Sequence, residues 1–170
     1  MKIVNVKYQV YQFKELSKEV KEKVKATWYE NEDYYMLSDD LKESCKMFLD
    51  ENKIKYNDDL NLGYSLSYSQ GDGLNFTGNF EWKKYLIKIT HSWRYSFASS
   101  SDIVIMDEEG EEINDEKIEK QFKDLYLDIC KKLENEGYGV IEYRMDDKEF
   151  QELCNSNEYN FLKDGKMVNL

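Results

Sequence analysis

The sequence predicts an α+β fold, in which a largely antiparallel sheet of about five to seven strands carries helices on one face. Residues 61–97 contain three segments with alternating apolar and polar side chains, which is typical of strands that bury one face. The predicted order of elements places four strands in succession, which implies antiparallel pairing. A chain of 170 residues without a break in composition fits one domain, residues 1–170.

The central stretch predicts two long strands, a turn at residues 70–73, and a third strand. The two glycines of this turn suit a tight connection, because glycine tolerates a positive φ. The polar faces of the strands are expected to point toward solvent or a partner. The alternating apolar residues are Leu60, Leu62, Tyr64, Leu66 and Tyr68 on the first strand, Leu74, Phe76, Phe80 and Trp82 on the second, and Tyr85, Ile87, Ile89, Trp93, Tyr95 and Phe97 on the third.

Three elements are expected before the central strands. Residues 2–13 alternate as in a strand. Ser17 can cap a helix that ends near Glu30, because a serine hydroxyl accepts a hydrogen bond from a free backbone N–H of the first turn. Ser38 can cap a second helix, for which Asn52 is a plausible terminator.

The second half of the chain begins with a short apolar strand at residues 103–106. A long helix is expected over residues 114–135, where apolar side chains recur on one face. Gly137 stands where a glycine commonly ends a helix. The remaining predicted elements are a strand at residues 140–143, a helix that begins at Asp146 and Asp147, and a hairpin at residues 163–166.

The charge of the chain argues against direct binding of nucleic acid. Lysine and arginine number 24 against 35 aspartates and glutamates, which gives a net charge of −11. Each phosphate contact needs a cation, so DNA or RNA is disfavoured and a basic partner surface is favoured. Aromatic residues make up 15% of the chain, which indicates that the acidic residues belong to a folded body rather than a disordered tail.

The sequence also predicts a cytoplasmic protein without a membrane segment. Cys45, Cys130 and Cys154 are odd in number and far apart, which favours reduced thiols in the core. The N-terminus is too short and polar for a signal peptide, and no run approaches the roughly 18 apolar residues that a membrane span needs.

No catalytic, metal or cofactor site is predicted. His91 is the only histidine; it shares the apolar parity of its strand, and no nucleophile motif accompanies it. Asp72, between two glycines, could contact a cation or substrate, or could simply belong to a tight turn. Residues 107–110 hint at calcium, but glycine falls in the wrong register for an EF-hand loop.

The strongest functional signal is a run of carboxylates at residues 107–119, called the acidic segment below. Eight carboxylates and one lysine give it a net charge of −7. Helix-dipole complementation and a solvated surface would explain such a run. Carboxylates three or four residues apart on a helix also lie roughly 5–6 Å apart, close to the spacing of phosphates along a nucleic-acid strand. The carboxylates are Asp107, Glu108, Glu109, Glu111, Glu112, Asp115, Glu116 and Glu119.

A second candidate surface, the aromatic–acidic patch, lies between the first two predicted helices. Exposed aromatic side chains beside acids are good anchors for a protein interface. The residues predicted to bind a partner there are Glu30, Glu32, Asp33, Tyr34 and Tyr35, with Trp28, Tyr29, Asp39 and Asp40 around them.

Two segments carry a resemblance to a protein family. Residues 10–17 (VYQFKELS), followed by a helix, and residues 64–73 (YSLSYSQGDG) resemble stretches of small acidic, mostly uncharacterised proteins from phages and mobile elements of Gram-positive bacteria. Some of these proteins are labelled antitoxin. The resemblance covers roughly the first half of the chain and implies a phage or mobile-element setting, but it brings no catalytic residues.

The sequence therefore predicts a non-enzymatic inhibitor of a host defence system that handles nucleic acid, of anti-CRISPR or anti-restriction type. The acidic surface would mimic nucleic acid and occupy the groove of a basic host nuclease or effector. An antitoxin that neutralises a basic toxin is an alternative. Another is a ligand-binding protein or enzyme that uses the polar face of the sheet, with a cleft lined by Asp72, Asn75, Thr77, Asn79, Glu81, His91, Ser92 and Arg94.

Overall fold

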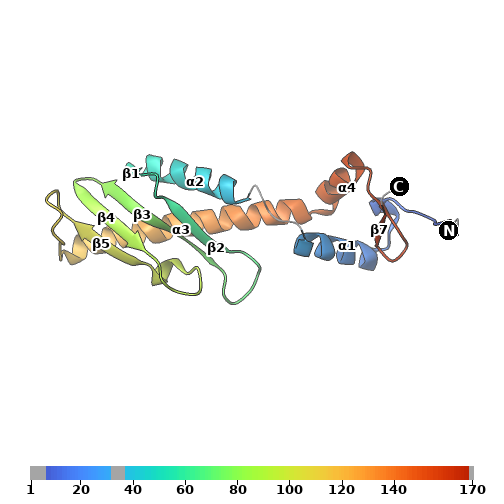
Figure 1. The fold of residues 1–170 in the computed structure, drawn as a ribbon, viewed down its shortest axis with the longest axis horizontal. Helices are drawn as coiled ribbons and strands as arrows, with labels where there is room; N and C mark the ends of the chain where they lie inside the picture. Colours follow the sequence, from blue (N-terminus) through green and yellow to red (C-terminus); the bar gives the residue numbers. More distant parts are fainter. Residues whose placement is uncertain (1–6, 32–36, 169–170) are drawn as a thin grey trace, which may run out of the picture. The chain divides into compact units, whose positions relative to one another are not determined.

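A computed structural model describes residues 7–31 and 37–168 (Figure 1). The chain divides into two compact units, each of which is described by itself. The central unit comprises residues 34–140. The terminal unit combines the two ends of the chain, residues 1–33 and 141–170.

The central unit is built on an antiparallel sheet of five strands, as the sequence predicts. The long strand β3 is its spine: β1 and β2 pair with different parts of one edge of β3, and β4 and β5 follow in order on the other side (Figure 1). The bounds are β1 Ile54–Tyr56, β2 Asn61–Ser65, β3 Gly73–Trp82, β4 Tyr85–Thr90 and β5 Asp102–Met106.

One face of this sheet packs against helix α3, Glu116–Met145, which runs along the sheet (Figure 1). The Phe76 and Tyr126 rings lie 4.7 Å apart between their centroids, and the Trp82 and Phe122 rings lie 5.3 Å apart. Helix α2, Leu37–Glu51, buries its apolar stripe of Leu37, Leu41, Cys45 and Leu49 in the same unit. The period-two alternation of β3 and β4 and the helical period of α3 thus build one core.

Helix α3 is longer than predicted, and the strand predicted at residues 140–143 is wrong, because the helix continues through them. Gly137 does not end the helix. A Cβ at Gly137 would overlap with Cδ1 of the buried Leu66, so the glycine allows a close approach of the β2–β3 loop to the helix.

The first and third of the predicted central strands are also shorter than expected, whereas β3 covers the predicted second strand. The third strand does not continue to Phe97: β4 ends at Thr90, and residues 91–97 form an irregular loop. The turn between β2 and β3 spans residues 66–72 rather than a tight connection. Within it the residue with positive φ is Tyr68, at 56°, and neither Gly71 nor Gly73.

The terminal unit has its own core between helices α1, Lys18–Asn31, and α4, Asp147–Ser156. A short turn of helix, η1 Phe13–Glu15, and the predicted hairpin, β6 Asn160–Phe161 with β7 Met167–Val168, complete the unit. Of the strand predicted at residues 2–13, residues 2–6 lie outside the described residues, and Tyr11 forms a single bridge to Phe161. The buried core residues are Phe13, Leu16, Val24, Phe150, Cys154 and Phe161.

The three cysteines are free and buried, as predicted. Burial raises the pKa of the Cys45 and Cys130 thiols to about 12 and that of Cys154 to about 11. Among the helices described here, none combines the length and apolar composition needed to cross a bilayer.

Replacement of each of the two glycines of α3 by alanine should separate the effect of packing on stability from the effect of helix propensity. Gly139 lies on the same helix, is exposed, and has open space where a Cβ would stand. Gly139→Ala should therefore raise the free energy of unfolding by about 0.5–1 kcal/mol. Gly137→Ala should lower it by about 1 kcal/mol or more, because Leu66 must move out of a packed site. Urea unfolding measures both, and equal stabilisation of the two variants would contradict the close approach.

The thiols should be inert in the folded protein, because the thiolate is the reactive form and burial suppresses it. At pH 8, native protein should consume far less than one equivalent of Ellman's reagent in an hour, and protein in 6 M guanidinium should consume three within minutes. Rapid reaction of one thiol in the native protein would show that its site opens.

Candidate functional site

The acidic segment forms the connection from β5 to α3, and two of its carboxylates shape that connection. The Asp107 carboxylate accepts hydrogen bonds from the backbone N–H groups of Glu109 (3.0 Å) and Glu111 (2.9 Å). The Asp115 carboxylate caps α3 by accepting from Lys117 N and Ile118 N, at 3.0 and 3.2 Å. Helix-dipole complementation is therefore part of the explanation of this run.

The other carboxylates of the segment are exposed to solvent. These are Glu108, Glu109, Glu111, Glu112, Glu116 and Glu119. Within the described residues, none of them forms an ion pair with a lysine or arginine. Elsewhere in the central unit such pairs are common, as in Lys55–Glu81 at 2.7 Å and Lys120–Asp124 at 2.6 Å. Lys83 and Lys84 share a shallow hollow of about 320 Å³ with Glu108, and Lys117 belongs to the segment itself.

Most of the aromatic–acidic patch lies outside the described residues. Residues 32–35, and hence Glu32, Asp33, Tyr34 and Tyr35, lie outside the described residues, and so does the side chain of Glu30. Trp28 lies in the terminal unit, with its ring centroid 6.0 Å from that of Phe150 and 5.4 Å from that of Tyr159.

Asp72 organises the loop between β2 and β3. Its carboxylate accepts from Ser67 N (2.8 Å), Ser69 N (3.1 Å), and the hydroxyls of Ser65, Ser67 and Ser69 at 3.0–3.1 Å. The Tyr138 hydroxyl of α3 donates a further, short hydrogen bond. With six donors around it, the carboxylate has little capacity left for a cation or a substrate. This favours a structural role of Asp72 in the turn.

These hydrogen bonds change the acidity of the group. Partial desolvation alone would raise the pKa of Asp72, but the bonds from Tyr138, Ser69 and Ser67 outweigh it and hold the pKa well below its ordinary value. Partial burial and the hydrogen bond to the Asp72 carboxylate raise the pKa of Tyr138. Asp72 is therefore a carboxylate that stays ionised and stabilises the loop.

Two adjacent loops expose aromatic rings that the sequence placed on strands. Tyr68, Trp93 and Tyr95 are 61%, 66% and 44% exposed. The loops touch each other, since a Cβ on Gly71 would lie 2.8 Å from the Tyr95 ring. Tyr68 packs on Tyr138 with ring centroids 4.7 Å apart. The serines on both sides of residues 93–95 were the signal that could have revealed a loop.

His91 belongs to a structural chain of hydrogen bonds. Its Nε2 lies 2.8 Å from the Tyr95 carbonyl oxygen, and its Nδ1 lies 3.1 Å from Ser101 Oγ. Ser101 Oγ lies 2.7 Å from the hydroxyl of the buried Tyr126. In neutral His91 the Nε2–H donates to the carbonyl and the Ser101 hydroxyl donates to Nδ1. A backbone carbonyl rather than a carboxylate accepts from the ring, so the arrangement differs from a Ser-His-Asp triad.

The side chains proposed for a cleft on the polar face do not converge. Thr77, Asn79 and His91 line a shallow hollow of about 340 Å³ with Asp59 and Lys88. The remaining five do not line it; of these, Asn75 is buried in the sheet, Glu81 pairs with Lys55, and Asp72 holds its loop. In the described part of the chain, no three histidine, cysteine, aspartate or glutamate side chains are grouped to hold a metal ion.

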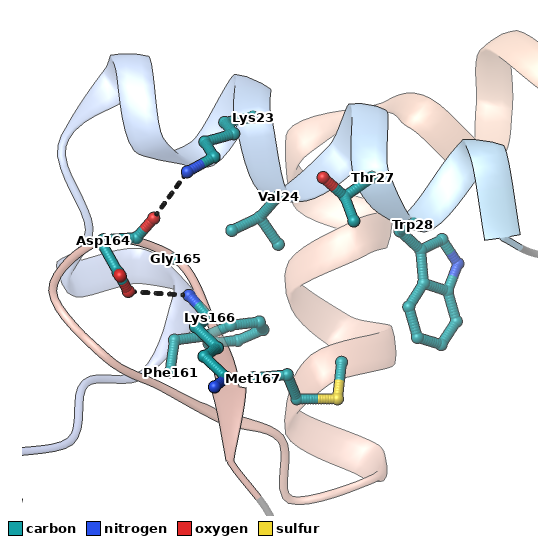
Figure 2. A pocket seen from close by; sticks show the side chains of 9 residues that line it. All are labelled: Lys23, Val24, Thr27, Trp28, Phe161, Asp164, Gly165, Lys166 and Met167. Carbon is teal, nitrogen blue, oxygen red and sulfur yellow. Dashed lines mark hydrogen bonds between the residues drawn. The ribbon is translucent and has the colours of Figure 1, made fainter.

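A groove in the terminal unit was not anticipated from the sequence. Figure 2 shows α1 on one side of it, with Val24, Thr27 and Trp28, and the β6–β7 hairpin on the other, with Phe161 and Met167. Its volume is about 420 Å³. It depends on a hairpin docking against a helix from the other end of the chain, which no local pattern reveals.

Comparison of the chain with models of protein families, with curated proteins and with solved structures finds no match. The phage or mobile-element family that residues 10–17 and 64–73 resemble therefore stays a prediction. Function has to be argued from the surfaces and groups described above.

Replacement of Asp72 by asparagine should destabilise the loop. The amide accepts at one oxygen only, so several serine donors lose their partner. The free energy of unfolding at pH 7 should therefore fall by about 1–3 kcal/mol. We expect a value at the lower end of this range, because the Asp72 side chain is partly solvated. Asp58→Asn, at an exposed aspartate in the loop between β1 and β2, should change it by less than about 0.5 kcal/mol.

The effect of Asp72→Asn should also depend on pH. A carboxylate with a lowered pKa stabilises the fold above the pKa of the unfolded group, about 3.9, and this contribution is lost as the pH falls below it. The difference between wild type and variant in urea unfolding should therefore be smaller at pH 3 than at pH 7. A difference that is the same at both values would mean that the charge of Asp72 is immaterial.

Proposed function

We propose that this protein is a non-catalytic inhibitor that binds a basic, nucleic-acid-handling protein through its acidic segment and competes there with nucleic acid. In the setting implied by the resemblance, the partner would be a host nuclease or defence effector. The single observation that carries the proposal is the set of exposed carboxylates that the described part of the protein leaves without cationic partners.

The density of exposed, unpaired carboxylates favours a binding surface over an ordinary solvated face. Exposed carboxylates without an ion pair also occur singly elsewhere in the described part of this unit, as at Asp58, but residues 108–119 hold six of them. A concentration of unpaired negative charge instead raises the local potential and attracts a basic surface. Its effect on association should be fast binding with a strong dependence on salt.

The shape of the connection also supports this function. Asp107 fixes the turn and Asp115 fixes the start of α3, so Glu108, Glu109, Glu111 and Glu112 extend from an ordered backbone. Ordered charges lose less conformational entropy on binding than charges on a flexible tail. The segment can thus present negative charge from a fixed backbone to a groove that normally holds phosphates. Of its exposed carboxylates only Glu116 and Glu119 lie on the helix, so the helical spacing expected from the sequence does not apply to the other four.

The same surface would suit an antitoxin that masks a basic toxin. The identity of a captured partner separates the two roles: a nuclease or effector that acts on foreign nucleic acid supports inhibition of defence, and a toxin encoded beside this protein supports the antitoxin role. A catalytic role on the polar face is not favoured, because Asp72 and His91 are engaged in structural hydrogen bonds.

Charge reversal tests the proposal. A variant with lysine at positions 108, 109, 111 and 112 should lose capture of the partner from a Gram-positive bacterial lysate at 50 mM salt, by at least about tenfold. Duplex DNA added as a competitor should displace the partner from the wild-type protein, and 500 mM salt should weaken capture.

A matched control separates the segment from net charge. Lysine in place of Asp50, Glu51, Asp58 and Asp102 makes the same change in net charge at exposed sites of the same unit. This variant should keep most of the binding. Equal loss of binding in both variants, or capture that DNA does not displace, would refute binding through the acidic segment.

A further inference from the structure

The groove of the terminal unit combines an apolar interior with a preformed shape. Val24 and Phe161 are buried in it, and Trp28 and Met167 are half-buried. The Trp28 side chain, which lines one side of the groove, packs against the rings of Phe150 and Tyr159. The hairpin turn lies directly on α1, because a Cβ on Gly165 would lie 2.8 Å from Val24 Cγ2.

Two ammonium groups border this apolar interior. Lys23 and Lys166 line the groove, and both are exposed. Lys23 Nζ lies 3.5 Å from the backbone carbonyl oxygen of Asp164, which is a long hydrogen bond. Within the described residues, neither ammonium has a carboxylate partner within 4.0 Å. On the same helix, Lys25 pairs with Glu22 at 3.2 Å and with Asp147 at 2.5 Å.

One carboxylate also lines the groove. Asp164 Oδ1 accepts a hydrogen bond from the backbone N–H of Lys166 at 3.1 Å, which fixes the hairpin turn (Figure 2). The charged side chains of the lining are thus two lysines and one aspartate, with a net charge of +1. This local sign is opposite to the charge of −11 of the whole chain.

We propose that this groove binds a small amphipathic carboxylate, a molecule with an apolar chain or ring and a single anionic head. The apolar part would lie against Trp28 and Met167, above the buried Val24 and Phe161, and the head would be attracted by the ammonium groups of Lys23 and Lys166. A volume of about 420 Å³ falls in the range of sites for small molecules, which are mostly apolar with a few polar groups that fix orientation. This inference is independent of the acidic segment.

Titration of the full-length protein with decanoate, below its micelle concentration, tests the inference. Amide NMR shifts should be concentrated at residues 23–28 and 161–167, and calorimetry should give one site. Each buried methylene contributes about a fourfold gain in affinity, so octanoate, which is two methylenes shorter, should bind about sixteenfold more weakly. Decyltrimethylammonium is the control for non-specific binding: the net charge of −11 attracts this cation, yet the groove should favour the anion.

Variants of the lysines locate the head group. Lys166→Glu and Lys23→Glu should each weaken decanoate binding by about three- to tenfold, and Lys166→Gln by about half as much on a logarithmic scale. Lys163→Glu, at an exposed lysine of the same hairpin that does not line the groove, should change it by less than twofold. Met167→Ala should weaken binding while the preference for the anion remains.

Several results would overturn the inference. These are the absence of shifts at the groove, equal binding of the cation, and equal effects of Lys163→Glu and Lys166→Glu. Binding of an acidic amphipathic peptide at the groove, with no binding of decanoate, would assign the groove to a protein partner and would also overturn it.

Discussion

The packing of the central sheet on α3 is the interaction on which the central unit depends. Phe76 and Trp82 of β3 meet Tyr126 and Phe122 of the helix, so the longest strand and the longest helix share one apolar interface. The hydroxyl of Tyr126 extends this interface into a polar chain through Ser101 to His91. One face of each central strand is thereby committed to the core, and the opposite face and the loops remain for recognition.

Aspartate carboxylates stabilise the loops around this core by accepting hydrogen bonds. Asp72 accepts hydrogen bonds from serine and tyrosine donors and holds the loop that exposes Tyr68. Asp107 and Asp115 shape the connection to α3. The neighbouring glutamate side chains of the acidic segment are exposed and, in the described part of the protein, stabilise no turn or helix end in this way. The division between structural aspartates and exposed glutamates is what makes the acidic segment a candidate surface rather than a featureless run of charge.

Period-two and helical patterns predicted the fold class, the helices α1, α2 and α4, and strand β5, because these elements follow from local burial. The predictions were wrong where contacts between residues far apart in the sequence determine the local structure. Gly137 looks like a helix end in the sequence, but it lies inside α3, where Leu66, far away in the chain, packs into the place that a Cβ would occupy. Trp93 and Tyr95 keep the parity of a strand, yet they lie in a loop against Gly71. The groove of the terminal unit joins the two ends of the chain, so no local pattern could reveal it.

The most direct test of the account is a footprint of the partner on this protein by amide hydrogen exchange in the isolated complex. Binding through the acidic segment predicts added protection at residues 107–119, lost when DNA displaces the partner. Protection confined to the aromatic loops, residues 66–72 and 91–97, or to the groove between α1 and the β6–β7 hairpin, with residues 107–119 unchanged, would contradict the account.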